Sequence, residues 1–218
     1  MFKNVAELVA QAQEKNKKIY EIMVEQEIEE TGKSQEEVYA LMSRHYYVMK
    51  NATEKGIKGV RSHSGMTGGD ARRMYDYIQK GSFITDKTLL TAACYAVATN
   101  EVNAAMGVVC ATPTAGSSGV LPGVLLAAKE KFHLSDDEVI KYLFTAGAFG
   151  YIIANNAFIS GAAGGCQAEI GSASAMAAAA VAEMAGGTPV QAAHAMAMAL
   201  KNMLGLACDP LAGLVEVP

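Results

Sequence analysis

Two cysteines of this 218-residue chain are placed where they could bind a metal. Cys166 lies in segment 161–169 (GAAGGCQAE) and Cys208 in segment 207–210 (ACDP), and in both segments glycine or proline interrupts an alanine-rich helical pattern. The sulfur of a deprotonated cysteine is a metal ligand, whereas a free cysteine is most often a small buried hydrophobe. Their separation of 42 residues matches no standard zinc or ferredoxin spacing, so both interpretations stay open.

The other two cysteines are predicted to be core residues. Cys94 lies among alanines within an expected helix, and Cys110 follows Val108 and Val109. Four cysteines in a chain of this length do not form the dense disulfide framework of small secreted domains. In a reducing compartment they would stay thiols or bind metal.

Hydroxyl side chains gather in residues 110–119, which we call the second loop. Its segment 112–119 (TPTAGSSG) contains Thr112, Thr114, Ser117 and Ser118 and precedes an expected helix. Successive amides and hydroxyls in such a turn can hold a carboxylate or phosphate at the helix N-terminus. The lysine of a P-loop is missing, which argues against nucleotide binding. A turn that only joins two buried helices would have a similar composition, so this alternative also stays open.

Residues 56–69 (GIKGVRSHSGMTGG), the first loop, contain five glycines and one histidine. His63 lies between two serines, and a histidine titrates near neutral pH, as a general acid or base must. An exposed loop histidine without a role is the alternative. The other three histidines, at positions 45, 133 and 194, are predicted to be structural.

The elements that would position these loops are all predicted to be helices. No segment alternates apolar and polar residues over the length of a strand, so the expected fold is all-α: a compact helical domain with glycine-rich loops between helices. The expected helical segments are residues 5–32, 34–55, 70–79, 87–106, 120–131, 136–155, 172–185 and 189–204. Capping boxes at Ser34 and Ser135, Asp70 and Asp86 as N-caps, and Thr188-Pro189 mark five of the starts. In the fourth segment, Leu89, Ala93 and Val97 have core spacing.

Composition indicates one domain with a well-buried second half. Hydrophobic residues make up 51% of the chain, and 28 of the charged residues fall in residues 1–101 against 12 in residues 102–218. Residues 1–55 are expected to form outer helices around a core formed by residues 56–218. The polar residues Asn156, Ser160, Gln167, Glu169 and Asp209 stand out in the uncharged half, where they could be caps or could orient cysteine ligands.

Charge and hydropathy exclude several classes of protein. A net charge of −4 without a basic cluster gives no footprint for nucleic acid, so a small organic substrate fits better. The uncharged stretches 102–128 and 142–168 contain prolines or amides that are costly in lipid, so no membrane span is expected. The N-terminus lacks the apolar run of a secretory signal, and the expected location is the cytoplasm.

Together the loops resemble the alpha chain of the iron–sulfur-dependent L-serine dehydratases. The matching segments are 64–71 (SGMTGGDA), 100–107 (NEVNAAMG), 111–119 (ATPTAGSSG), 156–161 (NAFISG), 165–169 (GCQAE) and 208–213 (CDPLAG). Each pattern alone is weak, but their order and spacing across most of the chain make the joint match specific.

The resemblance implies a lyase that removes water from L-serine to give an aminoacrylate, which takes up water again as it hydrolyses to pyruvate and ammonia. It also implies a [4Fe-4S] cluster held by three cysteines, with one iron open to substrate, and Cys166 and Cys208 match two of these ligands. The third is expected directly after a pair like Val217-Pro218, where the sequence stops, so the chain as given is expected to lack the last ligand and to be inactive alone. Pyridoxal phosphate is not expected, because no lysine lies in the second loop or between Lys141 and Lys201.

The resemblance also suggests roles for the loop residues. His63 is the candidate base, although a beta chain could supply the base instead. The candidate substrate-binding residues are Ser64, Thr67, Gly68, Thr112, Thr114, Ser117, Ser118, Asn156 and Ser160. The residues expected to orient the cluster loop, residues 160–169 (the third loop), are Gln167, Glu169 and Asp209. Expected partners are L-serine and either a beta subunit or further copies of the chain. Alternatives are L-cysteine or L-threonine as substrate, or a non-catalytic helical partner subunit.

Overall fold

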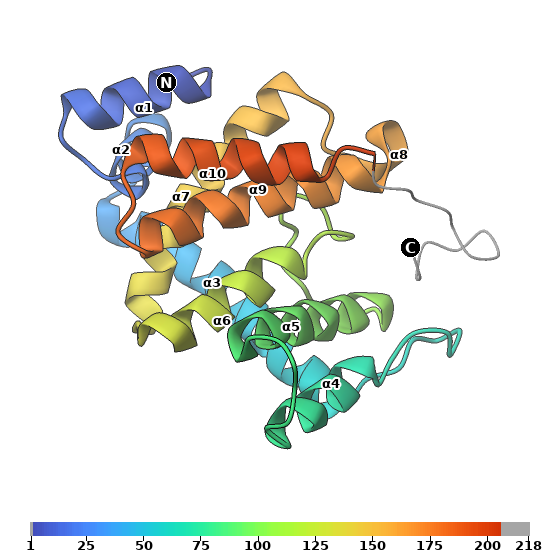
Figure 1. Ribbon diagram of the computed structural model, residues 1–218. Helices are drawn as coiled ribbons and strands as arrows, with labels where there is room; N and C mark the ends of the chain where they lie inside the picture. Colours follow the sequence, from blue (N-terminus) through green and yellow to red (C-terminus); the bar gives the residue numbers. More distant parts are fainter. Residues whose placement is uncertain (1, 206–218) are drawn as a thin grey trace.

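The structure is a computed structural model, in which residues 2–205 are described (Figure 1). This described part consists of ten α-helices and contains no strand, which confirms the all-α prediction. The helices are α1 (Val5–Glu14), α2 (Ile19–Thr31), α3 (Gln35–Lys58), α4 (Asp70–Gln79), α5 (Lys87–Ala104), α6 (Val120–Phe132), α7 (Asp136–Asn156), α8 (Gly161–Gly164), α9 (Cys166–Met184) and α10 (Pro189–Asn202).

Local capping explains most of the helix starts. The Ser135 hydroxyl accepts a hydrogen bond from the Glu138 amide at 3.2 Å, and the Glu138 carboxylate accepts one from the Ser135 amide at 2.7 Å. Ser34 and Thr188 begin α3 and α10 in the same way. These starts were predicted correctly because each cap satisfies the first-turn amides with side chains only three residues apart.

Three expectations about the helices were wrong. Residues 5–32 form two helices, with Asn16 in the left-handed region (φ 51°) between them. The third loop is largely helical, because α8 occupies residues 161–164 and α9 begins at Cys166 rather than at residue 172. Asp70 is the first residue of α4, and its N-cap is Gly69, which has no side chain to cap with.

The buried face of α5 also differs from the predicted one. Leu89 is 64% exposed, whereas Ala98 and Glu101 are buried beside Cys94, the residue of this helix that was correctly predicted to be in the core. The small residues lie inward because other helices come very close: a Cβ added to Gly56 of α3 would lie 2.1 Å from the Ala98 carbonyl oxygen. The close approach of the two helix backbones therefore selects small residues for the buried face of α5.

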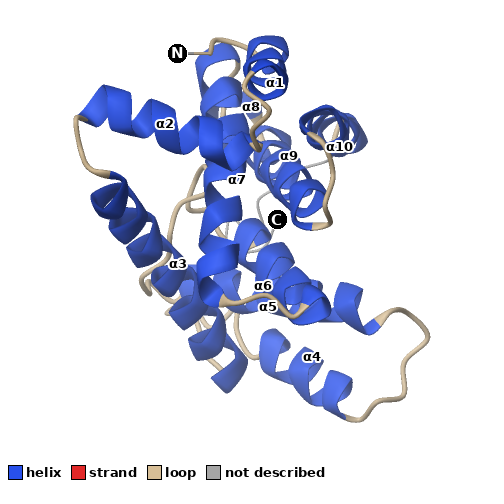
Figure 2. Ribbon diagram, turned by 90° about the vertical axis from the view of Figure 1, so that its left-hand side faces the viewer, coloured by secondary structure: helices blue, strands red, loops and turns tan. Residues whose placement is uncertain are grey.

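One apolar core unites the N-terminal and C-terminal helices. Helix α7 runs through the middle of the molecule, with α2 and α3 on one side and α9 with α10 on the other (Figure 2). Phe144 and Phe149 of α7 meet Ile19 of α2 and Tyr46 of α3 in this core, and Ala175 of α9 packs on it from the other side. No helix in residues 2–205 combines the length and apolar character that a membrane crossing needs.

The Gly56→Ala substitution is expected to lower the free energy of unfolding by about 1–3 kcal/mol, because the added methyl group must push two backbones apart. The check is urea unfolding followed by circular dichroism. Gly147→Ala is the matched control, since a Cβ at Gly147 meets nothing within 4 Å, and there the substitution should stabilise helix α7 by about 0.5–1 kcal/mol. Equal effects of the two substitutions would contradict the close approach of α3 and α5.

Asp136 joins three helices at the start of α7. Its carboxylate accepts hydrogen bonds from the Tyr46 hydroxyl (2.5 Å) and the Lys50 ammonium (3.0 Å) of α3, and lies 3.0 Å from Lys129 Nζ of α6. Burial alone would raise the pKa of Asp136, but the bonds from Tyr46, Lys50 and Lys129 outweigh it and hold the pKa well below its ordinary value. The ionised carboxylate therefore stabilises the fold.

The Asp136→Asn substitution is expected to cost about 1 kcal/mol of stability at neutral pH. Because the folded pKa is lowered, this contribution is complete above the ordinary carboxyl pKa of about 3.9 and is lost as pH falls below it. The unfolding free energies of the wild type and the variant should therefore differ by a constant amount from pH 7 to about pH 4 and converge only as pH falls further, towards the lowered pKa of Asp136. Asp137→Asn, at an exposed carboxylate of the same helical turn, is the control. A difference between wild type and Asp136→Asn that does not change with pH would refute the assignment.

Candidate functional site

The second loop is a tight turn held by its own hydroxyl groups. It joins the C-terminal end of α5 to the N-terminal end of α6. The buried Ser117 hydroxyl donates to the Thr112 carbonyl oxygen at 3.0 Å and lies 3.1 Å from the Thr114 hydroxyl. The Thr112 amide donates to the Thr114 carbonyl oxygen at 3.1 Å, and the Thr112–Pro113 peptide bond is cis. Ser117 thus fixes the shape of the turn.

Two buried hydroxyls of this loop have no hydrogen-bond partner among residues 2–205. They are Thr112 Oγ1 and Ser118 Oγ. Buried polar atoms are nearly always hydrogen-bonded, and an unpaired one costs about 1–3 kcal/mol. These two hydroxyls can therefore offer hydrogen bonds to a bound polar group without giving up existing ones.

Glu169 of α9 connects the second loop to the third. Its Oε2 accepts a short hydrogen bond from the Thr114 hydroxyl, 55 residues away in sequence. Glycines of both loops pack on the same carboxylate: a Cβ added to Gly116 would lie 2.8 Å from Glu169 Oε1, and one added to Gly161 would lie 2.6 Å from it. The carboxylate thus fills a space that side chains at either position would take.

Cys166 is the first residue of α9 and lies one turn before Glu169. The chain enters this helix through Gly165, whose φ of 76° suits glycine. Residues three apart share a helix face, and the partial positive charge of a helix N-terminus favours a thiolate. The position therefore fits a cysteine that binds a metal cluster.

The two predicted cluster ligands lie only partly within the described residues. In residues 2–205, no group of three or more histidine, cysteine, aspartate and glutamate side chains is arranged to hold a metal ion. Cys208 and Asp209 lie outside the described residues, so their predicted roles and the distance between the two cysteine sulfurs stay predictions. Cys94, by contrast, is a core residue as predicted: it is fully buried, and burial raises the pKa of its thiol to about 11.

Other predicted residues near the third loop have structural bonds. Asn156 donates its two amide hydrogens to the carbonyl oxygens of Ile152 and Lys3, which leaves its oxygen for the predicted substrate contact. The Ser160 hydroxyl caps α8 by accepting from the Ala162 amide at 3.2 Å. Gln167 accepts from the Gly205 amide at 3.2 Å and so joins the start of α9 to the end of α10.

The first loop is folded on a buried serine. The Ser62 hydroxyl accepts from the Thr67 amide at 3.1 Å and lies 3.1 Å from the Ser64 hydroxyl. Gly68 has φ 135°, and a Cβ there would lie 2.3 Å from the Val60 carbonyl oxygen. His63, the candidate base, is exposed at the tip of this turn.

Sequence reasoning assigned no role to three residues near the end of α5 that contact the second loop or the start of α4. Asn103 donates to the Ala115 carbonyl oxygen of the second loop at 3.1 Å, and a Cβ at Gly119 would lie 2.6 Å from Asn100 Oδ1. Glu101 accepts from the Asp70 amide at the start of α4, at 2.6 Å. A signal was present: Glu101 lies seven residues after Cys94, which was predicted to be in the core, and therefore on the same helix face.

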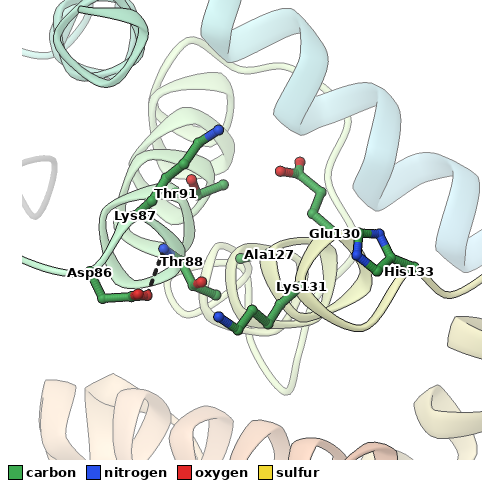
Figure 3. Close-up of a pocket in the computed structure, with 8 residues that line it drawn as sticks. All are labelled: Asp86, Lys87, Thr88, Thr91, Ala127, Glu130, Lys131 and His133. Atoms are coloured by element: carbon green, nitrogen blue, oxygen red, sulfur yellow. Dashed lines mark hydrogen bonds between the residues drawn. The ribbon is translucent and has the colours of Figure 1, made fainter. Parts of the chain in front are cut away.

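A separate pocket of about 390 Å³ lies at the opposite ends of α5 and α6 (Figure 3). Its lining residues are Asp86, Lys87, Thr88, Thr91, Ala127, Glu130, Lys131 and His133. None of them belongs to the three loops. The pocket is therefore distinct from the place where the second and third loops meet.

The protein is thus of an all-α class in which two loops rich in glycine and hydroxyl groups, the second and the third, meet at the N-terminal end of α9. The chain belongs to the serine dehydratase alpha chain family, whose model matches residues 14–218. The resemblance inferred from the six sequence segments is therefore confirmed.

Three relatives show how far the similarity extends. The chain is 58% identical over 218 residues to the probable L-serine dehydratase alpha chain of Bacillus subtilis (strain 168), an alignment that covers 100% of the chain and 73% of that relative. It is 40% identical over 223 residues to the L-serine dehydratase alpha chain of Peptoniphilus asaccharolyticus and covers 75% of it. It is 35% identical over 224 residues to the L-serine dehydratase of Haemophilus influenzae and covers 49% of that longer protein.

Proposed function

We propose that this chain is the alpha chain of an L-serine dehydratase, a lyase that converts L-serine to pyruvate and ammonia. Family membership and the names of the relatives support the reaction. The structural observation that carries the proposal is Glu169, which joins the hydroxyl-rich second loop to the helix that begins at Cys166.

The reaction itself explains why these residue types would be needed. Dehydration of serine removes a weakly acidic α-proton and expels hydroxide, which is a poor leaving group. A [4Fe-4S] cluster, when bound, supplies an open iron that acts as a Lewis acid toward the substrate hydroxyl. Among the described residues, Cys166 would bind the cluster. Cys208, which lies outside them, is the second proposed ligand. Pyridoxal phosphate is not proposed, because the second and third loops contain no lysine.

The second loop would bind the polar groups of the substrate. Thr112 and Ser118 have buried hydroxyls without a hydrogen-bond partner among residues 2–205, so they are the proposed partners of the substrate carboxylate or amino group. Thr114 and Ser117 would act indirectly, because their hydroxyls already hold the turn and the Glu169 carboxylate. Held in this way, the loop presents its hydroxyls in a fixed geometry, which favours reaction by lowering the entropy lost in the transition state.

The proposed base is His63, and the proposed second subunit is a beta chain. His63 is exposed between two serines, and an imidazole can act as a general base or acid. The alpha-chain names of two relatives support a multi-subunit enzyme, and a beta chain could instead supply the base. We place the enzyme in the cytoplasm, where a reducing environment would keep the proposed cluster cysteines from forming disulfides.

The test is the steady-state rate of pyruvate and ammonia formation by the anaerobically reconstituted enzyme with its partner subunit. L-serine, L-threonine and L-cysteine are compared at equal concentrations. The highest kcat/KM with L-serine supports the proposal. A preference for L-cysteine or L-threonine would reassign the substrate, and a folded, iron-loaded protein that converts none of the three would indicate a non-catalytic subunit.

A further inference from the structure

Glu101 is a buried glutamate that caps a helix to which it does not belong. The side chain, on α5, is only 2% exposed, and its Oε1 accepts hydrogen bonds from the Asp70 amide at 2.6 Å and the Ala71 amide at 3.2 Å. These amides begin α4, directly after the first loop. Gly69, the N-cap of α4, offers no side chain, so Glu101 takes the place of a local cap.

The same turn of α5 also supports the second loop. Asn103 Nδ2 donates to the Ala115 carbonyl oxygen at 3.1 Å, and Gly119 packs against Asn100 Oδ1 and the Ala96 carbonyl oxygen. In Figure 1, α5 lies between α4 and α6, the two helices that follow these loops. Residues 100–103 therefore contact the C-terminal boundary of the first loop and the interior of the second.

We propose that Glu101 is a positioning residue that sets the first loop relative to the second. This proposal rests on the proposed function, because those loops carry the proposed base and the proposed substrate hydroxyls. A local side-chain cap at position 69 is disfavoured by the φ of 88° at Gly69, and it would not tie α4 to α5. The second oxygen of Glu101, Oε2, is buried without a hydrogen-bond partner in the described residues, an unfavourable arrangement for a cap that served stability alone.

Glu183 provides a matched control, because it is also a buried glutamate that caps a distant helix. It lies near the C-terminal end of α9, far along that helix from Cys166, and is 1% exposed. Its carboxylate accepts from the Ile19 amide at the start of α2, at 2.6 Å, and from the Thr145 hydroxyl. Glu183 thus caps a distant helix as Glu101 does, but α2 follows none of the three loops.

The test compares Glu101→Gln, Glu101→Ala, Glu183→Gln and Glu183→Ala in the reconstituted enzyme. Amide hydrogen exchange of residues 60–72 and kcat and KM for L-serine are measured for each. Glu101→Ala should lower kcat/KM by about 100-fold, the order expected when reacting groups are misplaced by about 1 Å. Glu101→Gln should lower it less, because its amide oxygen can still accept from both backbone amides. Amide hydrogen exchange in residues 60–72 should become faster in the Glu101 variants and not in the Glu183 variants. The Glu183 variants should be less stable than wild type, with kcat within about twofold of the wild-type value.

Two results would overturn the proposal. One is unchanged exchange of residues 60–72 in both Glu101 variants. The other is a loss of kcat in the Glu183 variants as large as the loss in the Glu101 variants. Failure of the proposed function looks different: wild-type enzyme would form no pyruvate from L-serine, while the exchange measurement would still decide whether Glu101 positions the first loop.

Discussion

Glu169→Ala is expected to lower kcat/KM for L-serine by about 100-fold or more. The substitution removes the acceptor of the Thr114 hydroxyl and empties the space between Gly116 and Gly161. The second loop and the start of α9 then lose their shared contact, so the substrate hydroxyls and the proposed cluster ligand no longer keep a fixed separation. Steady-state kinetics on the reconstituted enzyme provide the check.

Two further variants separate geometry from charge at Glu169. Glu169→Gln keeps the shape and one acceptor oxygen, so its loss should be intermediate. Gly161→Ala keeps the Glu169 carboxylate but displaces it, because the new Cβ would lie 2.6 Å from Oε1. The kcat/KM of this variant should therefore also fall. Rates within about twofold of wild type for Glu169→Ala would show that the contact has no part in the reaction.

Cys166→Ala is expected to abolish cluster binding and with it pyruvate formation. Loss of one thiolate ligand leaves an incomplete set, because iron–sulfur clusters are held chiefly by cysteine sulfur. Iron and sulfide content, visible absorbance and kcat should all fall together, with kcat reduced by about 1,000-fold or more in the absence of the Lewis acid.

The other cysteines provide controls for Cys166→Ala. Cys110→Ala removes a half-buried thiol of the second loop, whose pKa is raised by burial, and should leave the iron content unchanged. Cys94→Ala removes a buried core thiol and should lower stability only. A Cys166→Ala protein with the iron content and absorbance of wild type would refute the ligand assignment.

Sequence alone predicted the helix starts that depend on local chemistry. Ser34, Asp86, Ser135 and Thr188 cap helices with side chains that bond amides two or three residues away, so the pattern is visible in a short segment. The start of α9 at Cys166 was not predictable in this way. It follows a run of small residues, and its N-cap, Gly165, has no side chain.

Long-range contacts account for the residues that sequence reasoning missed. Glu101 and Glu183 cap helices 30 or more residues away in sequence, and no local pattern connects a donor with an acceptor at that separation. The buried face of α5 was misjudged for a similar reason. Apolar size suggested Leu89, whereas the approach of Gly56 favours small side chains such as Ala98.

The candidate site was predicted as a set of residues but not as an arrangement. Thr114 and Glu169 were both selected from the sequence, yet nothing in the spacing of 55 residues indicated that they bond to each other. The glycines at 116 and 161 explain why they can, because both leave room for one carboxylate. Cys208 and Asp209 lie outside the described residues, and their roles stay predictions.

The central claim is that the second loop and the start of α9 form one functional unit around Glu169. A double-mutant cycle of Thr114→Val and Glu169→Gln, measured as kcat/KM for L-serine, tests it most directly. We predict a coupling energy of at least about 1 kcal/mol, with the double variant no slower than the slower single variant. Effects that simply multiply, with a coupling energy near zero, would contradict the claim.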